Sequence, residues 1–83
     1  MTRFKNKVIL VTGGKTGIGL AIAHRLRAEG GVVITAQRRN YDDDPNAWQA
    51  DLATAMGCKT IIDKISDDFG QLDLLINNAG VMK

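Results

Sequence analysis

The sequence predicts an α/β fold built on a parallel sheet. Two β-branched runs, residues 8–11 and 32–35, flank a segment with helical periodicity. Strands joined through a crossover helix in this way are parallel, because an antiparallel pair needs only a hairpin. The alternation continues with a second helical segment and a last apolar run. The 83 residues allow at most one small domain or part of one.

The composition is that of a soluble globular chain, with 45% hydrophobic residues, 24% charged residues and a net charge of +2. It is too apolar for a disordered protein, and its single cysteine excludes a disulfide scaffold. No apolar run approaches the roughly 20 residues that span a bilayer, and residues 1–7 lack the apolar centre of a signal peptide. We therefore expect a cytoplasmic protein without a membrane contact. Acids and bases interleave, so no nucleic-acid partner is expected.

The first half of the chain predicts a strand, a loop, a helix and a strand. Residues 8–11 form a continuous apolar run, which is typical of a strand buried on both faces. Good helix formers occupy residues 20–29, and two glycines end this segment. One apolar stripe at a spacing of four residues is expected to face the sheet, and it comprises Ile18, Ile22 and Leu26.

The second half predicts a polar turn, a short strand, a helix and a last strand. Residues 38–46 contain two arginines, three consecutive aspartates and the only proline, which favours a turn over a helix. A short strand is expected over 47–50 and another over 72–76. Thr54 and Gly70 are suited to begin and end the helix between them. Its predicted apolar face comprises Cys58, Ile61, Ile62, Ile65 and Phe69.

The densest chemical signal is the sequence Thr-Gly-Gly-Lys-Thr-Gly-Ile-Gly at residues 12–19, between the first strand and the first helix. Glycines allow positive φ and let backbone N–H groups approach a phosphate, which the helix N-terminus also attracts. A P-loop would need glycine at Ile9, and G-x-G-x-x-G would need glycine at Ile22. The pattern that remains is G-x-x-x-G-x-G, at Gly13, Gly17 and Gly19.

This loop resembles the cofactor-binding motif of the short-chain dehydrogenases/reductases. A second motif of that family, Asn-Asn-Ala-Gly, stands at residues 77–80, after the fourth predicted strand. Two motifs in the right order are more specific than either alone, and they favour this family over an unrelated nucleotide-binding βαβ unit. The resemblance implies a Rossmann-type parallel sheet of strand order 3-2-1-4. Residues 1–83 would then be a partial NAD(P)-binding domain, truncated after the fourth strand.

The resemblance also implies roles for individual residues. The glycine loop would hold the pyrophosphate and the adenosine ribose, and Ile18 would supply a main-chain contact. Asp51 would accept a hydrogen bond from the adenine amino group, and Leu52 would flank the ring; the less favoured alternative is that Asp51 is only a helix-entry acid. The predicted cofactor-binding set is Gly13, Lys15, Thr16, Gly17, Ile18, Gly19, Arg38, Asp51, Leu52, Asn78, Ala79 and Gly80.

The end of the second predicted strand favours NADP over NAD. An acid at this place would bind the ribose 2′-OH, whereas an arginine would accept a 2′-phosphate. Ala36 occupies the acid's usual place, and Arg38 and Arg39 follow it. Guanidinium groups can bind phosphate with two parallel hydrogen bonds, and Lys15 could add a further positive charge. The competing interpretation is that both arginines are solvated loop charges that balance the aspartates at 42–44.

The catalytic residues of the resembled family are absent from these 83 residues. The family's serine and Tyr-x-x-x-Lys pair lie well after the Asn-Asn-Ala-Gly motif, and here three residues follow it. The only tyrosine, Tyr41, has a proline four positions later, and the only serine, Ser66, lies late in a helix. His24 is expected on or near a helix surface, and Cys58 as a buried or half-buried structural thiol. No residue cluster has metal-ligand spacing.

The chain is therefore expected to be the cofactor-binding part of an oxidoreductase. The complete enzyme would transfer a hydride between NAD(P)H and a small alcohol or carbonyl substrate, and it would form a homo-oligomer. The 83 residues alone would be inactive, marginally stable and prone to self-association, because their fourth strand leaves an open edge. The alternative is a truncated, non-catalytic module that binds a nucleotide or another subunit. A reading frame that continues past Lys83 would distinguish these interpretations.

Overall fold

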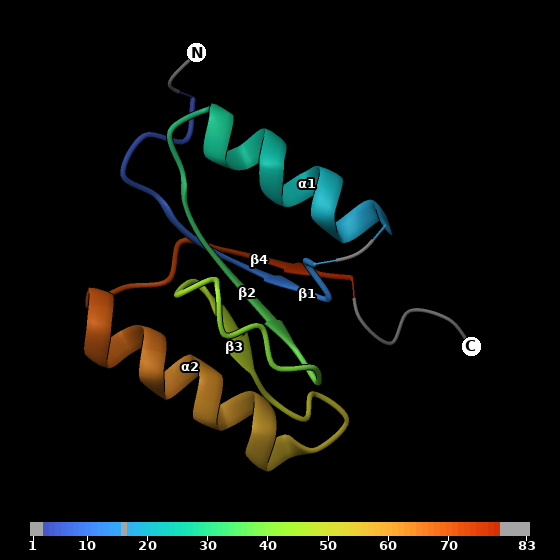
Figure 1. Ribbon diagram of the computed structural model, residues 1–83. Helices are drawn as coiled ribbons and strands as arrows, with labels where there is room; N and C mark the ends of the chain where they lie inside the picture. Colours follow the sequence, from blue (N-terminus) through green and yellow to red (C-terminus); the bar gives the residue numbers. More distant parts are fainter. Residues whose placement is uncertain (1–2, 16, 79–83) are drawn as a thin grey trace.

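The computed structural model describes residues 3–15 and 17–78 (Figure 1). Four parallel strands form one sheet of order β3-β2-β1-β4, as the sequence predicts. One helix lies on each face of this Rossmann-type sheet (Figure 1). The elements are β1 (Val8–Thr12), α1 (Gly17–Ala28), β2 (Val32–Gln37), β3 (Ala47–Gln49), α2 (Ala55–Phe69) and β4 (Leu74–Asn77).

β1 is a central strand, and all five of its residues are buried. Its register pairs Val8 with Val32 of β2 and Ile9 with Leu74 of β4. Successive side chains of a strand point to opposite faces, so β1 contributes to two cores, and both faces require apolar residues. The core on the α2 side comprises Val8, Leu10, Ile34, Ala36, Ile61 and Ile65; that on the α1 side comprises Ile9, Val11, Ala23, Leu26 and Val33.

The predicted apolar stripe of α1 is partly wrong. Ile18 is 74% exposed, and the buried positions are Gly19, Ala23 and Leu26. The reason lies at the start of the helix, where the backbone approaches the glycine loop so closely that only glycine fits. A Cβ at Gly19 would lie 2.1 Å from the carbonyl oxygen of Gly13. This contact turns Gly19 toward the sheet, and Ile18, about 100° away around the helix, faces solvent.

Both predicted caps of α2 are confirmed. The Thr54 hydroxyl accepts a hydrogen bond of 3.0 Å from the Gly57 N–H, which satisfies one free donor of the first turn. Gly70 has the left-handed conformation, with φ of 76°, and its N–H donates to the carbonyl of Ser66. These local signals fix the helix ends, so α2 spans the predicted segment.

The predicted apolar face of α2 is only half buried. Ile61 and Ile65 lie in the core, whereas Ile62 and Phe69 are each 37% exposed. The expectation of a buried or half-buried Cys58 is wrong, because this thiol is exposed. It borders a groove of about 480 Å³ between α2 and the sheet. β4 is an edge strand, and no other described element covers this side of the groove.

The remaining segments agree with the sequence apart from their ends. Residues 38–46 contain turns and no helix, and β3 is short. β4 begins at Leu74 rather than at residue 72, because Asp73 joins β1 through its side chain. Its Oδ2 accepts a hydrogen bond of 2.8 Å from the Val8 N–H, and its own N–H donates to the Val8 carbonyl. Neither described helix has both the length and the apolar character needed to cross a membrane.

Candidate functional site

The candidate site lies at the carboxyl-terminal edge of the sheet. The chain passes from β1 to β2 on one side and later returns to place β4 on the other side of β1 (Figure 1). Loops that leave neighbouring strands in opposite directions open a crevice there, which is where open α/β sheets bind ligands. The glycine loop follows β1 at this point, and Asn78 directly follows β4.

The glycine loop has a backbone that other residues could not adopt without strain. Gly13 has φ of 66°, in the left-handed region, and its N–H donates a hydrogen bond of 2.7 Å to the Ala36 carbonyl. At Gly19 an added Cβ would also lie 2.7 Å from the Asn78 Nδ2. No bulky side chain therefore separates the glycine loop from the start of α1 and the end of β4. The first N–H groups of α1, which have no acceptor within the helix, lie near the crevice.

The Thr12 side chain connects the glycine loop to the end of β4 by hydrogen bonds. Its hydroxyl accepts a hydrogen bond of 2.8 Å from the Asn78 N–H, and the Asn78 side-chain amide donates to the Gly13 carbonyl at 3.3 Å. The Thr12 hydroxyl also lies 3.2 Å from the Asn77 Oδ1. Thr12 is not among the predicted site residues, although it opens the glycine motif. The structure also gives Asn78, a member of the predicted cofactor-binding set, a contact that positions the glycine loop.

A cleft of about 300 Å³ lies beside the glycine loop, between the ends of β2 and β3. It brings together four residues of the predicted cofactor set: Gly13, Arg38, Asp51 and Leu52. The rest of the lining is Gln37, Ala50 and Ala53. The Gln37 Oε1 is buried and has no hydrogen-bond partner among the described residues, whereas the Nε2 donates to the Trp48 carbonyl.

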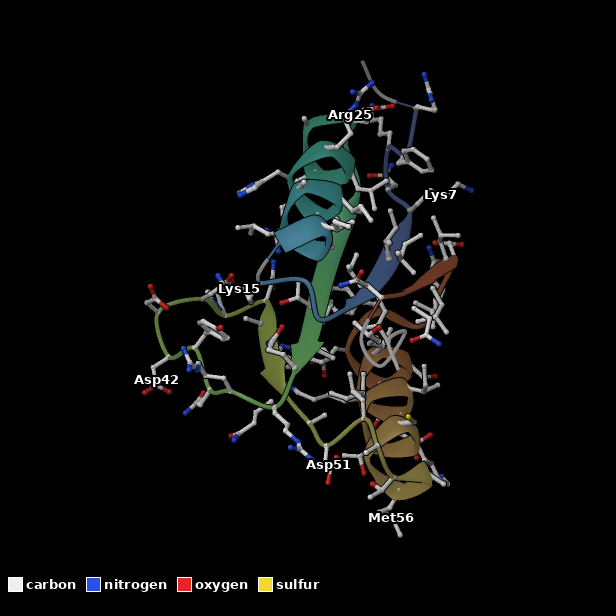
Figure 2. The ribbon with its side chains drawn as sticks, turned by 90° about the vertical axis from the view of Figure 1, so that its right-hand side faces the viewer. Lys7, Lys15, Arg25, Asp42, Asp51 and Met56 are labelled. Carbon is white, nitrogen blue, oxygen red and sulfur yellow. The ribbon has the colours of Figure 1, made fainter. Side chains whose placement is uncertain are left out.

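Asp51 stands at the mouth of this cleft, on the connection between β3 and α2 (Figure 2). Its Oδ1 accepts a hydrogen bond of 3.1 Å from the Ala53 N–H and lies 3.7 Å from the Arg38 Nη2. Its carbonyl accepts from the Thr54 hydroxyl. The contacts with the Ala53 N–H and the Thr54 hydroxyl therefore support the interpretation of Asp51 as a helix-entry acid. They leave the Oδ2 without a described hydrogen bond, so a second role as an adenine acceptor is compatible with them.

Lys15 lies outside the lining of the cleft and points instead toward the loop 38–46 (Figure 2). Its ammonium group forms an ion pair of 3.1 Å with Asp44 and lies 5.0 Å from the centre of the Tyr41 ring. Burial raises the pKa of Asp44, but the hydrogen bond from the Asn46 N–H and the ion pair with Lys15 outweigh it and hold this pKa below its usual 3.8.

The other predicted residues divide into two groups, those at the start of α1 and those outside the described residues. Gly17 begins α1 with φ of 54°, and Ile18 follows it in the first turn with its side chain facing solvent. Thr16, Ala79 and Gly80 lie outside the described residues. Within residues 3–15 and 17–78, no group of three or more His, Cys, Asp or Glu side chains could hold a metal ion.

Comparison with known proteins identifies the family. The family model described as short chain dehydrogenase matches residues 7–83. The chain belongs to this family. The two sequence motifs therefore have their expected context, since the glycine loop joins a buried strand to a helix and the Asn-Asn-Ala-Gly motif begins at the end of β4.

Several short-chain dehydrogenases resemble the chain over nearly its whole length. It is 38% identical to sorbitol-6-phosphate 2-dehydrogenase of Klebsiella pneumoniae over 82 residues, which cover 93% of the chain and 31% of that protein. It is 34% identical to 3-oxoacyl-[acyl-carrier-protein] reductase of Haemophilus influenzae, covering 95% and 36% of the two proteins. The ligand-free aldohexose dehydrogenase of Thermoplasma acidophilum superposes with a TM-score of 0.86 at 32% identity, covering 99% of the chain and 32% of that structure. The chain spans about a third of the length of these relatives.

Proposed function

We propose that the chain is the cofactor-binding part of an NAD(P)-dependent short-chain oxidoreductase that interconverts an alcohol and a carbonyl compound. The observation that carries the proposal is the contact of the glycine loop with Asn78 beside the cleft of about 300 Å³. Residues 1–83 then form a partial Rossmann domain. The bound nicotinamide supplies the hydride acceptor or donor, and the complete enzyme binds a small substrate and assembles as a homo-oligomer.

The described residues fit a dinucleotide in two places. The glycine loop and the start of α1 offer backbone N–H groups and a partial positive charge to a pyrophosphate. The neighbouring cleft offers the Leu52 side chain and the Asp51 carboxylate to an adenosine. Adenosine carries an apolar ring face together with hydroxyl and amino donors, which these groups complement. In this proposal Thr12 and Asn78 are positioning residues, because they hold the loop on which the pyrophosphate rests.

The proposed cofactor is NADP, with NAD as the alternative. No carboxylate stands at the end of β2, where Ala36 is buried, and Arg38 lines the cleft. The Arg38 side chain is 77% exposed and lies 3.7 Å from the half-exposed Asp51 carboxylate. Such a surface ion pair contributes at most about 1 kcal/mol, whereas hydrogen bonds between a guanidinium and a phosphate are stronger. A 2′-phosphate can therefore recruit Arg38 at little cost.

We further propose that the 83 residues alone catalyse no hydride transfer. The single tyrosine, Tyr41, packs against Lys15 in the loop 38–46, and the single serine, Ser66, lies in the last turns of α2. Neither residue lines the cleft. Alone, the chain would act as a nucleotide-binding module, and NADPH oxidation with a panel of aldehydes and ketones should stay at the background rate.

The decisive experiment is calorimetric titration of the chain with NADPH. Gly19→Ala adds the single methyl group that would lie 2.1 Å from the Gly13 carbonyl oxygen, so this variant should lose most of its affinity. Ile18→Ala changes the adjacent, solvent-facing side chain and should bind like the parent. Circular dichroism of both variants checks that they retain their helices. Failure of the parent to bind NADPH, or equal binding by a folded Gly19→Ala variant, would refute the proposal.

A further inference from the structure

The loop 38–46 folds back onto the glycine loop. It joins β2 to β3 without a helix, and Figure 2 shows Lys15 directed toward it. It brings Asp44 to Lys15 across 29 positions of sequence. The Lys15 Nζ and the Asp44 Oδ2 are 3.1 Å apart, and the two side chains are only 21% and 22% exposed. The pair thus links the predicted phosphate-binding loop to a segment that also carries Arg38 at its start.

The Asp44 carboxylate is held in place independently of Lys15. Its Oδ1 accepts a hydrogen bond of 2.9 Å from the Asn46 N–H, and its carbonyl accepts from the Ala47 N–H at 3.1 Å. The Asn46 carbonyl in turn accepts from the Thr35 N–H of β2 at 2.8 Å. The sheet therefore fixes the carboxylate, and its Oδ2 is directed at the lysine without further ordering of the loop.

Two of the three cations that the sequence assigns to a 2′-phosphate, Arg38 and Lys15, consequently differ in availability. Arg38 is exposed and loosely paired with Asp51, at 3.7 Å. Lys15 is largely buried, paired at 3.1 Å, and also lies against the Tyr41 ring. A phosphate that recruits Lys15 must replace a partly desolvated carboxylate, which costs more than displacing an exposed one. It must also approach the negative charge of Asp44 itself.

We propose that Asp44 is a specificity-determining residue whose carboxylate competes with a 2′-phosphate for the Lys15 ammonium group. The ion pair lowers the affinity for a 2′-phosphorylated nucleotide and leaves the affinity for the unphosphorylated one unchanged. This inference rests on the proposed nucleotide-binding function. It assigns the preference between NADP and NAD to a balance between Arg38, which favours the phosphate, and Asp44, which opposes it.

The test compares adenosine 2′,5′-bisphosphate with 5′-AMP by calorimetric titration of the 83-residue chain. Asp44→Asn keeps an oxygen that can accept from the Asn46 N–H but removes the charge that holds Lys15. We expect it to raise the ratio of the two affinities roughly five-fold, the equivalent of about 1 kcal/mol for one ion pair. Asp43→Asn, an equal charge change at an exposed position of the same loop, should alter the ratio less than two-fold.

A second background shows whether the effect passes through Lys15. Lys15→Met keeps most of the apolar stem and removes the charge, so the gain from Asp44→Asn should disappear in the double variant. Trp48, the single tryptophan, donates from Nε1 to the Pro45 carbonyl at 3.0 Å, so its fluorescence reports the position of the loop. An unchanged emission spectrum in Asp44→Asn establishes that the loop has not moved.

Three results would overturn the inference: an unchanged ratio in Asp44→Asn, an equal gain in Asp43→Asn, or a gain that persists with Lys15→Met. Each of these results requires nucleotide binding, so each leaves the proposed function standing. Failure of the parent chain to bind either probe would instead refute the proposed function, and this inference with it.

Discussion

Replacing Arg38 with alanine separates the two cofactors most directly. Arg38 is 77% exposed, and among the described residues its side chain forms one ion pair, a distance of 3.7 Å to Asp51. Loss of that exposed pair costs at most about 1 kcal/mol and should barely affect folding. A hydrogen bond between a charged side chain and a phosphate contributes about 1.5 to 3 kcal/mol, so the affinity for NADP should fall roughly 10- to 150-fold. NAD has no 2′-phosphate, and its affinity should change by less than about three-fold.

The assay is calorimetric titration of the parent and the variant with both cofactors at one fixed ionic strength, since salt screens exposed charges. Arg39→Ala is the matched control, because Arg39 is also exposed in the same loop but does not line the cleft. It should preserve the ratio between the cofactors. Equal losses of NADP and NAD affinity in Arg38→Ala would refute the reasoning, as would equal effects of the two arginine substitutions.

Three further outcomes concern stability and association. Thr54→Ala removes the cap of α2 and should lower the free energy of unfolding, measured in urea, by about 1 kcal/mol. Thr60→Ala, in the exposed middle of the same helix, should lower it by less than about 0.5 kcal/mol. Equal losses in the two variants would contradict the cap assignment. Because folding lowers the pKa of Asp44, its stabilisation is complete above the unfolded pKa near 3.8 and lost as pH falls through the lower folded pKa. Asp44→Asn should therefore be about 1 kcal/mol less stable than the parent at pH 7, and a difference that persisted at pH 2 would contradict this linkage. Leu75 is half-exposed in the middle of the open edge strand β4, so Leu75→Lys should reduce the self-association measured by sedimentation velocity. Met56 is exposed on α2 away from the groove, so Met56→Lys should leave the self-association unchanged. A parent chain that sediments as a stable monomer would contradict the expected association.

The sequence predicts the features of this fold that depend on short-range signals. The caps at Thr54 and Gly70, the buried run of β1 and the turns at 38–46 each follow from residues within a few positions of one another. The strand order comes from the family resemblance, and the structure confirms it. These signals need no knowledge of distant contacts.

The errors occur where distant contacts decide the environment. Ile18 has the correct spacing for a buried stripe, but the approach of Gly19 to Gly13 rotates it into solvent. Cys58 has the correct spacing for a buried face, but the side of the groove next to β4 is open in the described chain. The pair between Lys15 and Asp44 joins residues that are 29 positions apart, and no local pattern indicates it. Helical periodicity predicts which side chains share one face of a helix. It does not predict which face of the helix packs against the sheet.

The hydrogen bonds from Asn78 to Thr12 and Gly13 also bear on how the chain folds. They join residues 66 and 65 positions apart, so the glycine loop cannot reach its final form until β4 has docked beside β1. Contacts of such long sequence separation form at a high entropic cost and late in folding. A ligand that binds only the completed loop would favour the docked state by mass action. Amide hydrogens of β4 should then exchange more slowly when the nucleotide is bound, although the proposed pyrophosphate site lies on the glycine loop rather than on that strand.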